Sequence, residues 1–123
     1  GGNPVSPALL EKSEKFALSV LQLSRVRGTE EKRRLFTRLV RCCTGVGAVL
    51  HEGAFGVPLR EQLEFVTRAT RLCSLALYWL DLCSRSGLIA STQAGRIKEQ
   101  GEELRQACGD ELRAMMNRLN ENE

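Results

Sequence analysis

The chain has few of the residues on which catalytic and metal sites usually depend. It contains one histidine, one tryptophan and one tyrosine, and aromatic residues make up 5% of the whole. A zinc-protease motif needs a second histidine four residues after the first, but Phe55 stands four residues after His51. His51 and Glu52 are adjacent, so on a helix their side chains diverge by about 100° and cannot act together as an acid/base pair. We therefore expect no enzymatic activity, no cofactor and no metal site, and we interpret His51 as a structural or surface residue.

Long apolar runs are scarce as well. The apolar run at 72–80 is shorter than the ~20 residues that span a bilayer, and no secretory signal is recognisable near the start of the chain. We therefore expect a cytoplasmic protein that does not contact a membrane. The cysteines form no C-x-x-C pair, and we interpret them as reduced thiols that pack as small hydrophobic residues. They are Cys42, Cys43, Cys73, Cys83 and Cys108.

Apolar residues recur at helical spacing in four segments, and no segment alternates as a strand would. Ser6 and Pro7 predict the start of the first helix, and Gly28 should end it. Thr29 is the expected cap of the second helix, which should stop between residues 53 and 56. Its predicted buried stripe consists of Leu35, Leu39, Cys42, Val46, Val49 and Leu50.

The third helix should begin at Pro58 and end at Gly87, and Ser91 or Thr92 should cap the fourth. The fourth helix has a single apolar stripe, whereas the third has two apolar lines. The first line is Leu63, Val66, Thr70, Cys73, Leu77 and Leu80, and the second is Phe65, Leu72, Leu75, Trp79 and Leu82. A helix with two apolar lines needs two neighbouring helices or a partner subunit to cover them.

Four amphipathic helices joined by short turns predict an all-α fold, an antiparallel up-down-up-down four-helix bundle. We assign residues 6–120 to a single bundle domain and residues 1–5 to a disordered N-terminal segment or a cloning remnant. The glycine-rich stretch at 44–49 is not a phosphate loop, because no strand precedes it. We interpret Gly45, Gly47 and Ala48 as places where another helix approaches closely. In the fourth helix, Gly95, Gly101 and Gly109 have either the same role or mark a weak helix.

Basic residues gather in the second helix and just before it. The run consists of Arg25, Arg27, Lys32, Arg33, Arg34, Arg38 and Arg41, against only Glu30 and Glu31. Arg34, Arg38 and Arg41 are spaced i, i+4 and i+7, which places them in one row on a helix. A row of arginines suits the phosphates of a nucleic acid, because each guanidinium can hold two phosphate oxygens.

We therefore predict a nucleic-acid-binding surface that holds RNA or DNA through phosphate contacts. The candidate residues are Arg33, Arg34, Arg38 and Arg41, with Arg60, Arg68 and Arg71 as secondary contacts. Base stacking should contribute little, because the few aromatic residues mostly fit apolar stripes. The alternative is an ordinary solvated face whose arginines pair with carboxylates of neighbouring helices or subunits.

Two segments, LVRCCTGVGAVLHEGAFG and REQLEFVTRATRLCSLALYWLDLCSRSGLI, resemble a known family. It comprises the small four-helix-bundle proteins encoded in intervening sequences of large-subunit ribosomal RNA genes. The likeness covers about half the chain and rests on Arg41 before small residues, Ala48, Glu52-Gly53, Glu64-Phe65, Ser74-Leu75 and Gly87-Leu88-Ile89. Tyr78-Trp79-Leu80 is closer to a branch of the same superfamily, the accessory variability protein of diversity-generating retroelements. Gly47, Val49 and His51 depart from the family's pattern.

The resemblance implies a homopentamer with a basic surface, nucleic-acid binding and no enzymatic activity. In the retroelement branch it also implies a reverse transcriptase as partner. From the residues and the resemblance together we predict a non-enzymatic, oligomeric, nucleic-acid-binding accessory protein. The alternative is a protein-interaction scaffold that binds no nucleic acid.

Overall fold

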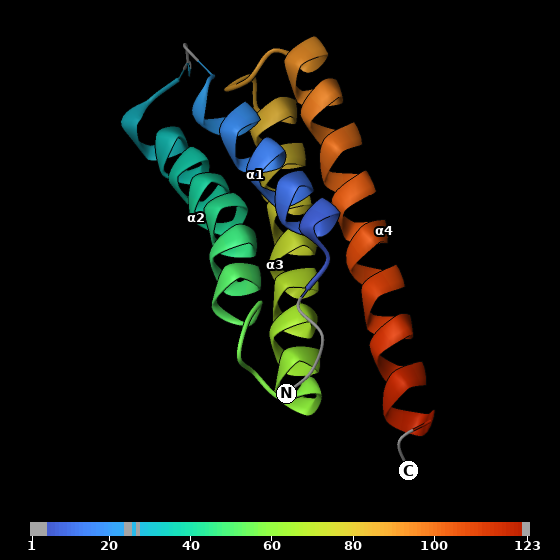
Figure 1. Cartoon of the computed structure of the whole chain (residues 1–123). Coiled ribbons are helices and arrows are strands. Elements are labelled where there is room, and N and C mark those ends of the chain that lie inside the picture. Colours follow the sequence, from blue (N-terminus) through green and yellow to red (C-terminus); the bar gives the residue numbers. More distant parts are fainter. Residues whose placement is uncertain (1–4, 24–25, 27, 122–123) are drawn as a thin grey trace.

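The computed structural model describes residues 5–23, 26 and 28–121 (Figure 1). It contains four helices, α1 (Pro7–Leu21), α2 (Glu30–Glu52), α3 (Leu59–Arg85) and α4 (Ser91–Glu121). Successive helices run in opposite directions, as the colour gradient in Figure 1 shows. The described residues form no strand. The prediction of an all-α, antiparallel up-down-up-down bundle is confirmed.

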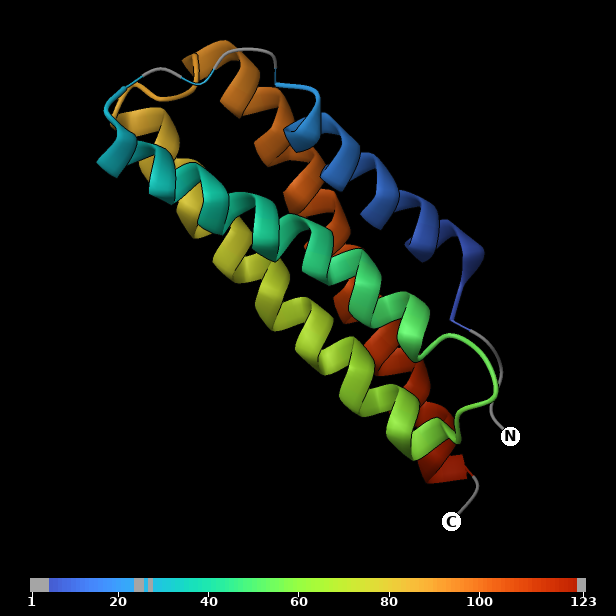
Figure 2. The ribbon, with the colours of Figure 1, turned by 90° about the vertical axis from the view of Figure 1, so that its left-hand side faces the viewer.

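The helices are arranged as a ring in chain order. α2 packs against α1 and α3, and α4 packs against α3 and α1. Figure 2 shows α2 and α3 side by side along most of their length. The α2–α3 pair and the α1–α4 pair therefore form opposite sides of the bundle.

The start of α2 follows from its local sequence. The Oγ1 atom of Thr29 accepts a hydrogen bond from the backbone N–H of Lys32 at 3.2 Å, as an N-cap residue does. Glu30 and Glu31 occupy the first turn, where the positive end of the helix dipole favours carboxylates. The prediction that Thr29 caps this helix is confirmed.

The predicted end of the first helix is wrong, because α1 stops at Leu21 instead of Gly28. The N–H of Leu23 bonds to the carbonyl of Val20 at 3.2 Å, a tighter turn that closes the helix. A continued helix would carry the chain along the bundle axis by about 1.5 Å per residue. By leaving the helix, the chain instead packs Leu23 and Val26 against the core. Arg25 and Arg27, which we counted in the basic run, lie outside the described residues.

The other boundaries differ from the predictions by only a residue or so. Pro58 precedes α3 as its cap residue, and Leu59 is the first helical residue. α4 begins at Ser91 itself, so the predicted cap is already inside the helix. Val5, which we assigned to the N-terminal segment, is buried, and its N–H donates to the carbonyl of Ala54 at 3.3 Å. Val5 therefore packs with the bundle.

The buried line of α3 lies between the two apolar lines predicted for it. It consists of Gln62, Val66, Ala69, Cys73, Ala76, Leu80 and Cys83, whereas Leu63, Thr70 and Leu77 are only half-buried. α3 has two neighbours, so its deepest side points between them, toward the bundle axis. On α2 the same kind of rotation buries Cys43 and leaves Cys42, which we predicted in the stripe, half-buried.

Close helix approach at glycine is confirmed at Gly101 and Gly47 and is wrong at Gly95 and Gly109. Among the described residues, a Cβ atom added at Gly95 would meet nothing within 4 Å, and one added at Gly109 would meet only Arg113 of the same helix. A Cβ atom added at Gly101 would lie 2.6 Å from Leu77 Cδ2 and 3.0 Å from Phe16 Cε1. A Cβ added at Gly47 would lie 3.2 Å from the hydroxyl of buried Ser13. α4 can therefore approach α1 and α3, and α2 can approach α1, only because these positions lack side chains.

Candidate nucleic-acid interface

Contacts between α2 and α3 fix how the predicted arginines lie relative to one another. Arg38 lies against Trp79, and Cβ atoms added at Gly45 and Gly53 would contact Leu72 and Phe65. The two helices are therefore in antiparallel register, and residues from Gly45 onward on α2 lie opposite residues 72 and below on α3.

In this register the row of arginines on α2 continues onto α3. We call the combined set the arginine surface, which consists of Arg34, Arg38 and Arg41 of α2 and Arg68 and Arg71 of α3. All of its members are exposed. The surface runs along the α2–α3 side of the bundle for roughly 20 Å, at about 1.5 Å per residue.

Trp79 anchors the centre of the arginine surface. Its ring is half-buried between the helices, and the guanidinium carbon of Arg38 lies 5.2 Å from the ring centroid. Trp79 also donates a hydrogen bond to the thiol of Cys42, which partly offsets the rise in the pKa of Cys42 caused by burial. These contacts hold Arg38 in place by a cation–π interaction while its charge stays at the surface.

Arg33 and Arg60 lie apart from this surface. Arg33 precedes Arg34, so its side chain points about 100° further round α2. Arg60 stands near the start of α3, about 12 Å along the helix from Arg68. The structure therefore brings together five of the seven predicted binding residues.

The arginines of the surface have no carboxylate partners among the described residues, whereas some basic residues elsewhere do. Lys12 pairs with Glu103 at 3.2 Å and Arg85 with Asp81 at 3.4 Å. On α4, two further arginines pair with carboxylates within their own helix. Ion pairs within the described chain therefore do not occupy these five arginines.

Charge is divided unequally between the two sides of the bundle. α2 and α3 together carry nine lysines and arginines against six acidic residues. α1 and α4 together carry seven against eight. The α2–α3 side is therefore the electropositive one, and anions should be attracted to it.

Two exposed apolar residues beside the arginine surface were missed by the sequence analysis. The side chain of Tyr78 is 53% exposed and that of Leu75 is 47% exposed. Both lie on the outer face of α3. Tyr78 belongs to neither apolar line predicted for α3, which was the signal available in the sequence. The second apolar line, by contrast, is largely covered within the chain, because Phe65, Leu72 and Trp79 pack toward α2.

His51 links two helices instead of forming a dyad with Glu52. Its Nε2 atom lies 3.4 Å from a carboxylate oxygen of Glu14 on α1, and its Nδ1 atom lies 2.9 Å from the carbonyl of Gly47. Both contacts lie on the exposed face of α2 where it meets α1. This geometry agrees with the structural or surface interpretation of His51.

The buried thiols of the core are expected to react poorly as nucleophiles. Burial raises the pKa of Cys73 to about 12 and the pKa of Cys83 and Cys108 to about 11, and it raises the pKa of Cys43 further still. Thiols protonated at neutral pH are poor nucleophiles. Within the described chain, no three His, Cys, Asp or Glu side chains are grouped as a metal site would require.

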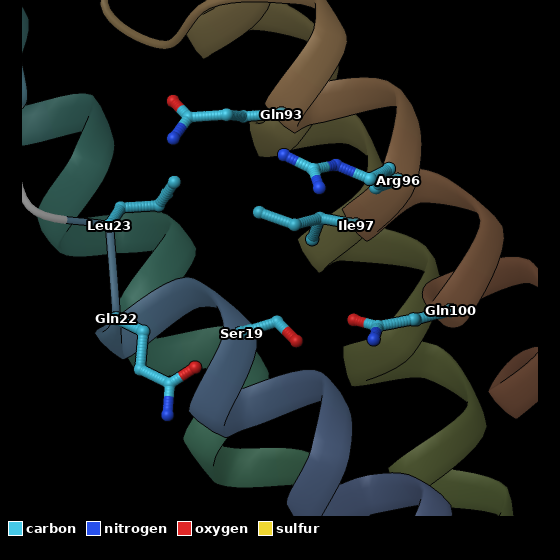
Figure 3. Close-up of a pocket in the computed structure, with 7 residues that line it drawn as sticks. All are labelled: Ser19, Gln22, Leu23, Gln93, Arg96, Ile97 and Gln100. Carbon is cyan, nitrogen blue, oxygen red and sulfur yellow. The ribbon is translucent and has the colours of Figure 1, made fainter.

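A cleft of about 290 Å³ lies on the opposite side of the bundle, between the end of α1 and the start of α4 (Figure 3). It is lined by Ser19, Gln22, Leu23, Gln93, Arg96, Ile97 and Gln100. Arg96, Ile97 and Gln100 project from α4 toward α1 (Figure 3). The Oε1 atom of Gln100 is shielded from solvent and has no hydrogen-bond partner among the described residues. The cleft is polar and lies away from the arginine surface.

Comparisons with known proteins identify no relative. No family model, no curated protein and no solved structure matches the chain. Over the part of the chain that the structure describes, no helix combines the length and the apolar character needed to cross a bilayer.

Proposed function

We propose that this protein is a non-enzymatic nucleic-acid-binding protein that holds phosphates with its arginine surface. The observation that carries the proposal is the row of five exposed arginines, none of which pairs with a carboxylate of the described chain. An arginine without an internal partner keeps all five N–H donors for a ligand. A phosphate backbone presents acceptor oxygens at regular intervals and gains from each such contact.

The finer parts of the proposal rest on the resemblance to the ribosomal-RNA intervening-sequence family. They are RNA as a ligand, assembly as a homopentamer, and a reverse transcriptase of a diversity-generating retroelement as partner. A cytoplasmic location is proposed from the sequence instead, because the cysteines are interpreted as reduced thiols. Assembly would suit this surface, because several copies of a weak phosphate site bind one nucleic acid with much greater avidity than a single copy.

The test is binding of a labelled structured RNA and a matched DNA duplex, measured by fluorescence anisotropy at several salt concentrations. We expect affinity to fall log-linearly with salt, because each phosphate contact releases counterions. In the variant R34E/R38E/R41E the binding should be lost at moderate salt. No binding to either ligand by folded protein at low salt would refute the proposal.

A charge-matched control separates the arginine surface from net charge. The variant K15E/R96E/K98E makes the same change in charge on the α1–α4 side, at three exposed positions. It should retain most of the affinity, although long-range repulsion will weaken binding somewhat. Equal losses in the two variants would show that the protein binds through overall charge alone.

A second candidate is a scaffold that binds an acidic partner protein. Exposed Leu75 and Tyr78 beside the arginines would suit a partner helix with both acidic and apolar residues. The two functions make different predictions about whether nucleic acid co-purifies with the protein. Nucleic acid that co-purifies and is removed by a high-salt wash favours the first function, and its absence together with failed RNA and DNA titrations favours the second.

A further inference from the structure

Tyr78 is an exposed aromatic residue that lies beside the arginine surface. More than half of its surface is accessible, and it projects from the C-terminal half of α3, one helical turn after Leu75. Arg71 and Arg85 stand seven residues before and after it, which on a helix means the same face and about 10 Å in either direction. The ring therefore lies between two cations on one face of α3.

The ring of Tyr78 is also restrained by its contact with Trp79. Its centroid lies 5.1 Å from that of Trp79 in an edge-to-face arrangement, the geometry that aromatic pairs prefer. Trp79 is in turn held by Arg38 and by its hydrogen bond to Cys42. Because Trp79 is fixed between two helices, Tyr78 loses little freedom when a ligand covers it.

The carboxylate nearest to Tyr78 along the chain does not oppose a nucleic acid there. Asp81 lies one turn further along α3 and pairs with Arg85 at 3.4 Å. That ion pair leaves the five unpaired arginines to set the local charge. An exposed aromatic ring beside exposed arginines is the combination that single-strand-binding surfaces use.

We propose that Tyr78 is a stacking platform for an unpaired base, so that the arginine surface prefers single-stranded segments to duplexes. The inference rests on the proposed function and specifies its substrate class. In a duplex both faces of each base are covered by its neighbours, so Tyr78 can reach a base only in a single strand, a loop or an end. Exposed Leu75 extends the apolar area beside the ring.

The experiment compares three labelled RNA probes of equal phosphate number: an unstructured strand, the same strand with abasic sites, and a hairpin duplex. Affinities are measured by fluorescence anisotropy with the full chain at one fixed salt concentration. The wild-type protein should bind the base-bearing strand roughly tenfold more tightly than the abasic strand, since stacking contributes a factor of this order per base.

The variant Y78A should abolish this difference, while its salt dependence stays as in the wild type because the phosphates are still held. Y78F should keep the difference, because stacking needs the ring and not the hydroxyl. Phe55, which is 68% exposed in the α2–α3 loop, provides the matched control, and F55A should behave as the wild type. Circular dichroism and light scattering would establish that Y78A folds and assembles normally.

Emission from Trp79 gives a second readout that does not depend on affinity. The chain has one tryptophan, and it contacts Tyr78 directly. A base on Tyr78 should quench this emission, whereas the abasic strand should not.

Equal affinity of the wild type for base-bearing and abasic strands would overturn the stacking proposal and leave the phosphate surface intact. A Y78F variant as weak as Y78A would also overturn it, because the hydroxyl would then be the contact. A changed mass for Y78A in light scattering would make Tyr78 a subunit-interface residue instead. Failure of all three probes to bind would refute the proposed function itself.

Discussion

The guanidinium carbon of Arg38 lies 5.2 Å from the centroid of the Trp79 ring, across the boundary between α2 and α3. Arg38 therefore both packs against Trp79 and contributes a positive charge to the surface. The contact lies within the arginine surface, and together with the contacts at Gly45 and Gly53 it marks the register in which Arg68 and Arg71 follow Arg41. It also means that a change at Arg38 affects stability as well as binding.

Replacing Arg38 with Ala should lower the free energy of unfolding by about 0.5–1 kcal/mol, the usual value of an exposed cation–π contact. Arg34 is exposed and contacts no ring among the described residues, so R34A should change stability by less than ~0.5 kcal/mol. Urea denaturation followed by Trp79 fluorescence measures both. If the two variants were equally stable, Arg38 would contribute charge alone.

Gly101 and Gly95 should respond in opposite ways to replacement with Ala. In G101A the new Cβ would press on Leu77 and on the buried ring of Phe16, and overpacking of this kind costs about 1–3 kcal/mol. Gly95 is exposed on the same helix, and no atom of the described residues lies within 4 Å of a Cβ atom added there. G95A should therefore stabilise by up to ~1 kcal/mol through helix propensity. Thermal unfolding of the two variants checks the sign, and stabilisation by G101A would contradict the close packing described above.

Cys42 should be the first thiol to react with an alkylating reagent. It is half-buried, whereas the other four cysteines are buried and have pKa values raised mainly by burial. Peptide mass spectrometry after brief alkylation at neutral pH should find the label at Cys42. In denaturant all five should react alike. Labelling of Cys83 or Cys108 at the rate of Cys42 would show that the core opens readily on that side.

Stability should fall as the pH rises above the ordinary pKa of cysteine. Burial raises the pKa of Cys73 from 9.0 to about 12. Between these values the unfolded chain loses a proton that the folded chain keeps, so the free energy of unfolding falls with increasing pH. The loss for one such thiol is about 1.4 kcal/mol per pH unit.

Urea unfolding at a series of alkaline pH values measures this slope. The slope should be shallower in C73A than in the wild type, and C42A should change it less because Cys42 is only half-buried. An unchanged slope in C73A would mean that the thiol ionises equally in both states. Comparing slopes separates this effect from the cost of the cavity that C73A leaves.

The sequence predicts those features of the fold that depend on a few neighbouring residues. Thr29 and the glutamates after it define the start of α2, because capping depends on a few neighbouring residues. The end of α1 could not be found in this way. No local signal requires the helix to stop at Leu21, and the chain leaves it so that Leu23 and Val26 can cover the core.

The candidate site likewise has a part that the local sequence predicts and a part that depends on how the helices pack. The spacing of Arg34, Arg38 and Arg41 places them in one row on any helix. Their continuation through Arg71 depends on the register of α3 against α2, which no single helix encodes. The exposure of Tyr78 depends on how α3 rotates between two neighbours, and that rotation also moved the buried line away from Leu63 and Leu77.

The ring order of the helices also gives the molecule two independent faces. The arginine surface occupies the α2–α3 side, and the cleft lined by Arg96 and Gln100 opens on the α1–α4 side. A strand laid along the first side leaves the second open to solvent. Occupation of the arginine surface therefore leaves the cleft between α1 and α4 accessible, and the two sides of the bundle are sterically independent of each other.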